Sequence, residues 1–331
     1  MTAAESVDLN TLPAPAFYFP PVNGRYEVKP GLAVFGTDFG NGMADRRVFQ
    51  IDRRFDRYRS VIEAARRERL SKYYRTRRLG TAAEPIVRFV VTRLNHEYPE
   101  LFTLTSHRRR GWRLKCRLTG EALEFDHELQ LHDSNLGPMP PYADALDALA
   151  AQVPEDIAVV RRASGREWLA ALHLCAPNYW GVEEKIGRDF VGLHEPVAGI
   201  EPINRKAEAM VTAMIEKGPY VRFVWGLTTD EHLNHHPEPA PGHDPAQWHG
   251  RRFDPDDPQL FLRVERQTTR GLPEADAALF TIRTYVTDCR TLTPEQRARL
   301  ASAVRSMTPE QLGYKGLADS HEAVAEWLER A

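Results

Sequence analysis

The sequence of 331 residues lacks the features that mark membrane, exported and disulfide-stapled proteins. No stretch approaches the roughly 18 consecutive apolar residues that cross a membrane, and the first ten residues carry acidic side chains where a signal peptide carries lysine or arginine. The three cysteines, Cys116, Cys175 and Cys289, form no C-x-x-C pair, which excludes a disulfide framework and a four-thiolate zinc or iron–sulfur site. We expect a cytoplasmic protein that contacts no membrane.

The common catalytic and nucleotide-binding motifs are also missing. The glycine-bearing segment GTDFGNG, residues 36–42, has neither a P-loop lysine nor the G-x-G-x-x-G spacing, so we expect a structural turn there. The chain contains no G-x-S-x-G nucleophile elbow and no H-E-x-x-H pair. Motif searching alone therefore assigns no reaction.

Charge is unevenly distributed along the chain. Lysine and arginine outnumber aspartate and glutamate by 23 to 12 in residues 1–120 and are outnumbered by 21 to 34 in the remainder. No zinc-finger or RNP-like signature or aromatic interleaving accompanies the basic residues, so we expect no nucleic-acid binding. The basic third could also contact an acidic partner protein or the acidic C-terminal part of the same chain. We expect a solvated helical face at six arginines: Arg53, Arg54, Arg57, Arg66, Arg67 and Arg69.

Hydrophobic periodicity indicates an α+β chain. Residues 1–35 are rich in proline and read as an extended arm, and helices are expected over 52–78 and 85–95. The alternation in WRLKCRL, residues 112–118, indicates a half-buried strand, with 124–132 as its hairpin partner. Further strands are expected at 157–161, 166–175 (a central strand), 219–229, 259–269 and 277–287, the last two as a hairpin, and further helices at 142–152, 201–217 and after the capping boxes at Thr293 and Thr308.

We therefore expect one antiparallel sheet drawn from residues 101 to 288, with helices before, within and after it. The segments are an N-terminal arm and helical region over 1–100, a core over 101–290 and C-terminal helices over 291–331, all forming one compact unit.

Histidines are concentrated between residues 231 and 258, in a loop rich in proline. Their spacing matches neither the helical H-x-x-x-H pair nor the strand H-x-H pair, and proline-rich loops hold ligands poorly unless they are tied down. We expect an exposed loop and keep a structural metal as the alternative for His232, His235, His236, His243 and His249.

Three less familiar stretches contain candidate site residues. His194 stands two residues before Pro196 in an apolar context, where a core histidine is the plain interpretation. Arg222 and Trp225 interrupt an apolar strand at 220–227. In LFLRVERQTTRGLP, residues 260–273, alternation sends Arg266 to the face of its apolar neighbours, where it needs either an internal carboxylate or a bound anion.

Ordered segments from about Arg25 to Tyr285 resemble the α-subunit of heme-dependent oxidative N-demethylase and its relatives. The segments are YEVKPGL, GTDFGNG, KYY, WGVEEKIG, GLHEPV, VERQTTRGLP and LFTIRTY. The resemblance implies a PAS-like antiparallel sheet with helices that enclose heme b, and oxygen-dependent conversion of a secondary methylamine such as dimethylamine to methylamine and formaldehyde. Two departures concern the substrate: WGLTTD with the loop after it is less typical, and Ala198 stands where proline is common.

The resemblance assigns roles to individual residues. His194 becomes the candidate axial ligand of the heme iron. Arg266, Arg222 and, less directly, Lys185 become candidates for the heme propionates, with a solvent-exposed lysine as the alternative for Lys185. Trp225 either packs on the porphyrin or fills the core.

A dialkylamine is a cation near neutral pH, and its pocket needs a carboxylate or an aromatic face. Glu265 is the candidate, although alternation sends it to the opposite face from Arg266 unless the strand bulges. The family pattern implies partner subunits: a reductase with NADPH, FMN and an iron–sulfur cluster, and chains that bind tetrahydrofolate. The alternative function is a heme-binding PAS-like sensor or ligand-binding protein without catalysis.

Overall fold

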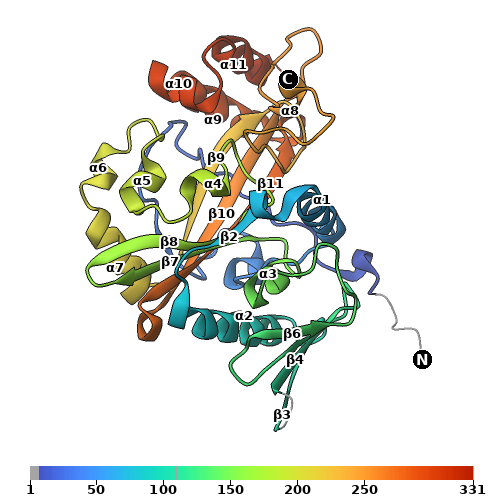
Figure 1. Ribbon diagram of the computed structural model, residues 1–331. Coiled ribbons are helices and arrows are strands. Elements are labelled where there is room, and N and C mark those ends of the chain that lie inside the picture. The colour runs from blue at the N-terminus through green and yellow to red at the C-terminus, as the bar shows by residue number, and fades with distance from the viewer. Residues whose placement is uncertain (1–6, 109–110, 331) are drawn as a thin grey trace.

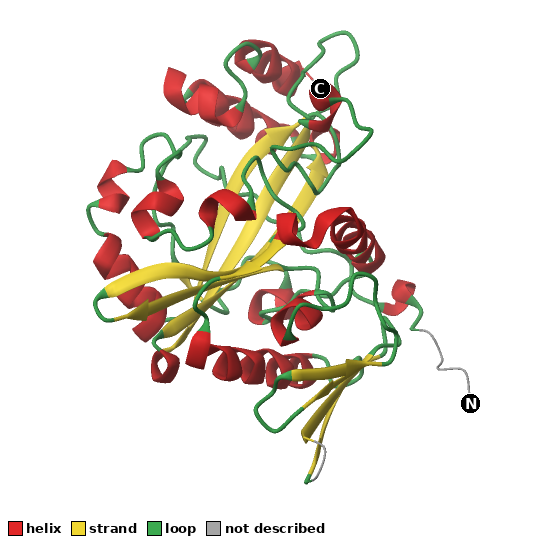
Figure 2. Ribbon diagram, in the orientation of Figure 1, coloured by secondary structure: helices red, strands yellow, loops and turns green. Residues whose placement is uncertain are grey.

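A seven-stranded antiparallel sheet is the centre of the computed structural model, which describes residues 7–108 and 111–330 (Figures 1 and 2). Its strands, in spatial order, are β1 (Ala33–Val34), β9 (Tyr220–Thr228), β10 (Phe261–Leu272), β11 (Ala277–Asp288), β7 (Asp156–Ala163), β8 (Arg166–His173) and β2 (Tyr74–Thr76). The predicted hairpin is confirmed as β10 and β11, which pair without a register shift. The strand expected to be central, β8, is instead next to the edge strand β2.

Four further strands form a sheet of their own: β3 (Phe102–His107), β4 (Gly111–Cys116), β5 (Ala122–Phe125) and β6 (Leu131–Ser134). The expectation of one sheet from 101 to 288 is therefore wrong. Helix α2 (Ala83–Glu97) lies between the two sheets (Figure 1), and its apolar side chains share one core cluster with both. Periodicity reveals strands but not their pairing, so it could not detect this division.

Helices flank the sheets as expected, with shifted ends. The predicted helix over 52–78 is α1 (Phe55–Tyr73), whose continuation forms β2. The helix at 142–152 is the shorter α3 (Ala145–Ala150), and that at 201–217 divides into α6 (Glu201–Asn204) and α7 (Ala207–Glu216). Both capping boxes are confirmed, at the starts of α9 (Pro294–Arg305) and α10 (Pro309–Lys315), and α11 (His321–Arg330) follows. No described helix is long and apolar enough to cross a membrane.

The N-terminal arm wraps the core. The Arg299 guanidinium donates to the Val22 carbonyl at 2.8 Å, and the Tyr26 amide donates to Ser306 Oγ at 2.8 Å, which fixes the arm to α9. The GTDFGNG segment is a structural turn whose Phe39 and Asn41 amides donate to the Asp45 carboxylate at 2.8 and 3.0 Å.

Strand alternation divides the central sheet into two faces, and both are covered. We call one of them the Glu265 face. Arg263 and Gln267 lie on it because they are two positions from Glu265 on β10, and Arg222 lies on it because it pairs with Gln267 across the strands. Helices α4 (Val182–Lys185), α5 (Phe190–His194), α6 and α7 pack on this side, against side chains of β7 and β11. The Arg266 face contacts the N-terminal arm and the C-terminal helices.

Candidate functional site

His194 ends helix α5 with one ring nitrogen already engaged. Helix α5 begins at Asp189, whose carboxylate accepts from the Gly192 amide at 2.8 Å. Nδ1 of His194 lies 2.7 Å from the Phe190 carbonyl, and because a carbonyl only accepts, Nδ1 carries the proton. The Nε2 lone pair of the neutral ring is then free to bind a metal, and a carbonyl on the second nitrogen is the usual partner of a metal-bound imidazole.

Two cations face His194. Burial lowers the pKa of His194, and the positive charges of Arg222 and Lys185 lower it further, against the effect of the Phe190 carbonyl. Lys185 is buried and donates from Nζ to the Leu193 carbonyl at 2.7 Å, so the interpretation of this residue as a solvent-exposed lysine is wrong. Burial also lowers the pKa of Lys185.

Arg222 lies on β9 directly opposite Gln267 of β10. Burial lowers the pKa of its guanidinium, and Glu265 is the charge that opposes this. Nε of Arg222 is buried and has no hydrogen-bond partner among the described residues. An unpaired guanidinium nitrogen at a buried position suits an anionic ligand.

Glu265 lies one position before Arg266 and points to the other face, because β10 pairs with both neighbours without a bulge. Its side chain is only 7% exposed, and Gln267 Nε2 donates to Oε2 at 2.9 Å. The charge of Glu265 acts on three cations, Arg222, Arg263 and Lys315.

Lys315 is a site residue that the sequence reasoning missed. It ends helix α10, donates from Nζ to the Trp225 carbonyl at 2.8 Å, and is buried. Burial lowers its pKa to about 8, with Glu265 opposing the shift. No sequence signal marked Lys315, since it looks like an ordinary lysine in the last turn of a short helix.

Arg266 and Trp225 lie away from this group of residues. Arg266 donates to the Arg47 carbonyl at 2.9 Å on the opposite face, with Nε and Nη1 buried and without a hydrogen-bond partner among the described residues. Trp225 packs in the core cluster of the C-terminal helices, and its ring centroid lies 5.6 Å from that of Tyr26 in an edge-to-face arrangement. The structure therefore brings together His194, Lys185, Arg222 and Glu265, and separates these four from the other two candidates.

The Glu265 face has the properties that a heme requires. Arg222, Val224 and Gln267 lie in the middle of a covered sheet and yet are only half-buried, so described side chains do not fill this part of the face. Val224 supplies an apolar side chain on this face, and the His194 ring and the unpaired Nε of Arg222 lie on the same side of the sheet. Heme needs an axial ligand, apolar contact and cations for its propionates, and the residues fit all three needs.

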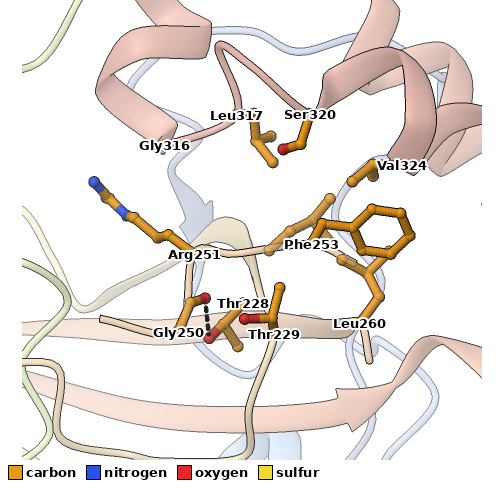
Figure 3. Close-up of a pocket in the computed structure, with 11 residues that line it drawn as sticks. Thr228, Thr229, Gly250, Arg251, Phe253, Leu260, Gly316, Leu317, Ser320 and Val324 are labelled. Atoms are coloured by element: carbon orange, nitrogen blue, oxygen red, sulfur yellow. Dashed lines mark hydrogen bonds between the residues drawn. The ribbon is translucent and has the colours of Figure 1, made fainter. Parts of the chain in front are cut away.

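A separate pocket lies between the end of β9 and helices α10 and α11 (Figure 3). Leu227, Leu260, Phe253, Leu317 and Val324 make it largely apolar, and the Arg251 side chain points away from it. Its empty space is about 220 Å³, including solvent at the mouth. None of the predicted site residues lines this pocket.

Two expectations about polar residues are wrong. Arg66 is buried and forms an ion pair with Asp147 instead of lying on a solvated face, so it cannot belong to a docking surface. His235 and His236 are buried although the loop was expected to be exposed. The ring of Tyr179 stacks on His235 and that of Tyr73 lies edge-on to His236, and single-sequence patterns do not reveal such contacts between distant segments.

Comparison with known protein families gives a match over most of the chain. Residues 41–325 match the family described as "Haem-dependent oxidative N-demethylase, alpha subunit-like". The matched range includes α5, β9, β10 and all six predicted site residues.

Proposed function

The chain belongs to the heme-dependent oxidative N-demethylase alpha subunit-like family, and from this premise we propose that it is the heme b subunit of an NADPH- and O2-dependent oxidative N-demethylase. The substrate is a secondary methylamine such as dimethylamine. The overall reaction consumes dimethylamine, O2, NADPH and a proton, and yields methylamine, formaldehyde, NADP⁺ and water. One oxygen atom enters formaldehyde and the other enters water.

The heme lies on the Glu265 face, in a PAS-like arrangement of sheet and helices. His194 would hold the heme iron through Nε2, and Arg222 and Lys185 would pair with the propionates. The observation that carries this proposal is the unpartnered Arg222 Nε on the side of the sheet where the His194 ring is oriented by Phe190. Bound heme supplies the redox centre for O2 reduction and methyl oxidation.

Glu265 orients the substrate. A secondary ammonium ion carries two N–H donors, and a buried carboxylate is a suitable acceptor for them. In the heme-free chain Glu265 is surrounded by the charges of Arg222, Arg263 and Lys315. Propionates that pair with Arg222 leave the carboxylate free for a cationic substrate. Arg266, with two unpaired buried nitrogens on the opposite face, and Trp225, in the core cluster of the C-terminal helices, take no part in this arrangement.

Electrons and product handling require other subunits. We assign NADPH, FMN and an iron–sulfur cluster to a partner reductase, and tetrahydrofolate, which captures formaldehyde, to further chains. The three cysteines of this chain are buried and far apart in sequence, as expected if the cluster is elsewhere. The α-subunit name of the family itself implies a multi-subunit enzyme.

An absorption spectrum of the purified protein, before and after heme addition, tests the proposal. We expect a Soret band corresponding to one heme per chain, a ferrous–CO difference spectrum, and formaldehyde release from dimethylamine when a reductase is supplied. Heme binding without any amine turnover would favour the sensor alternative. Absence of a Soret band under every loading condition would overturn the assignment.

His194→Ala is the sharpest variant. Because the side chain ends a short helix and is only half-buried, the fold should survive the change. Heme binding should be lost, or the ferric and ferrous–CO spectra should change strongly. Spectra identical to those of the wild type would show that another residue binds the iron.

A further inference from the structure

We propose that Asp230, His232 and His235 form a binding site for a divalent transition-metal ion, Zn²⁺ foremost. Each residue offers one ligand atom, and these atoms lie within 4.8 Å of one another. The three residues follow β9 in the order D-x-H-x-x-H. The proposed heme chemistry uses none of them, so this site stands independently of the proposed function.

The donor set and its spacing suit zinc. His235 Nε2 lies 2.9 Å from Asp230 Oδ1, and His232 Nδ1 lies 3.9 Å from Asp230 Oδ2. Imidazole nitrogen and carboxylate oxygen bind Zn²⁺ at about 2.0–2.2 Å, and a tetrahedral site therefore separates its ligand atoms by about 3.3–3.5 Å. The two separations, one shorter and one longer than this value, involve different oxygens of Asp230, so a rotation of the Asp230 carboxylate is needed to bring one oxygen into position with both rings.

Backbone and aromatic contacts fix the loop at this point, which removes the objection that proline-rich loops hold ligands poorly. The His235 amide donates to the Pro177 carbonyl, and the Tyr179 amide donates to the His235 carbonyl, each at 3.0 Å. The rings of Tyr179 and His235 stack at 5.3 Å with an interplanar angle of 4°. Arg263 donates to the Leu233 carbonyl at 3.0 Å, so its charge is engaged by the loop backbone.

One buried oxygen at this cluster has no hydrogen-bond partner among the described residues: Asp230 Oδ2, which is inaccessible to solvent. His235 Nε2 pairs with Asp230 Oδ1, and an ion would replace this hydrogen bond. A Cβ at Gly250 would lie 2.2 Å from Asp230 Oδ2, so glycine leaves room for the carboxylate. The His232 side chain is 61% exposed, which gives an ion an entry path and leaves one coordination position for water.

A second cluster, Asp156, His173 and Cys175, does not support the same inference. The Asp156 carboxylate already accepts from the Cys175 and Ala176 amides. Burial raises the pKa of the Cys175 thiol well above its usual value, so the metal-binding thiolate is disfavoured. All three side chains are buried, and the cluster is explained as part of the core.

The site is tested by titrating Zn²⁺ into the tag-free full chain after EDTA treatment, with isothermal titration calorimetry as the readout. Asp230→Asn keeps the shape of the side chain, and His232→Ala changes an exposed residue, so both variants should fold. His127→Ala, on an exposed histidine of the four-stranded region, is the matched control. His235 is fully buried and is left unchanged for that reason.

We expect one Zn²⁺ per chain in the wild type and in His127→Ala, and at least tenfold weaker binding in Asp230→Asn and His232→Ala. Zinc should also raise the melting temperature of the first two proteins and not of the last two. Equal binding by all four proteins, or no stoichiometric binding by the wild type, would overturn the proposal. A heme spectrum that is normal alongside failed zinc binding would leave the proposed function intact.

Discussion

Arg222→Met should have opposite effects on the heme-free protein and on heme binding. The guanidinium of Arg222 has a buried Nε without a hydrogen-bond partner among the described residues, and the charge that acts on it is that of Glu265. Methionine fills a similar volume without a charge and adapts to irregular surroundings. The substitution therefore removes an incompletely satisfied cation, together with the group that we propose to bind a propionate.

The magnitudes follow from these contacts. Replacing a complete buried ion pair by apolar side chains is commonly neutral or stabilising by about 1–4 kcal/mol, whereas removing one partner is destabilising when the other charge is left uncompensated. Glu265 is not left uncompensated here, because the charges of Arg263 and Lys315 still act on it. We therefore expect the free energy of unfolding of the heme-free protein to be unchanged or about 1 kcal/mol higher. Loss of a hydrogen bond to a charged group costs about 1.5–3 kcal/mol, so heme should dissociate roughly 10- to 150-fold more readily.

Urea unfolding of the heme-free protein and titration of heme, followed at the Soret band, measure both quantities. Arg270→Met is the matched control, because Arg270 is exposed on the same sheet and has the parity of Arg266. The control should retain wild-type heme affinity. Unchanged heme affinity in Arg222→Met, or a loss of more than about 2 kcal/mol of unfolding free energy, would refute the assignment of Arg222 to a propionate.

Three further predictions concern stability at other positions of the fold. Gly271→Ala should lower the free energy of unfolding in urea by about 2–3 kcal/mol, because a Cβ there would lie 2.0 Å from the Ile215 carbonyl oxygen. Gly313→Ala should raise the same free energy by about 0.5–1 kcal/mol, because a Cβ at this helical position would meet nothing within 4 Å. Burial raises the pKa of Glu155 from 4.5 to about 7, so the folded state keeps its proton while the unfolded state loses it, and stability falls as pH rises through this window. Glu155→Gln should remove this decrease in the free energy of unfolding, which amounts to about 3 kcal/mol. If the free energies of unfolding of the wild type and of Glu155→Gln changed in parallel with pH, the prediction would be wrong.

Local signals in the sequence predicted the local parts of the fold. Runs rich in apolar and β-branched residues located β9, β10 and β11. Such runs are typical of strands that are covered on both faces. The capping boxes at Thr293 and Thr308 located two helix starts, since side-chain and backbone donors within four residues determine them. These features depend only on neighbours in the chain.

Features that depend on distant contacts were missed. The strands of residues 102–134 pair among themselves because α2 separates them from the central sheet, and no periodicity records such a helix position. Lys315 reaches the carbonyl of Trp225, 90 positions away in the sequence. Burial of His235 likewise depends on Tyr179 and Arg263, which come from other segments.

The specific stretch LRVERQTTRGLP shows why resemblance alone cannot separate scaffold from site. Its residues alternate between two buried faces, so a shared motif contains both kinds of residue. Arg266 holds the Arg47 carbonyl of the N-terminal region, whereas Glu265 and Gln267 face the side of His194 and Arg222. A sequence comparison gives all of these positions equal weight, but the register of β10 divides them. The heme proposal therefore depends on the residues of β10 that share the Glu265 face. Substitutions of residues on the Arg266 face should change the free energy of unfolding more than they change heme affinity.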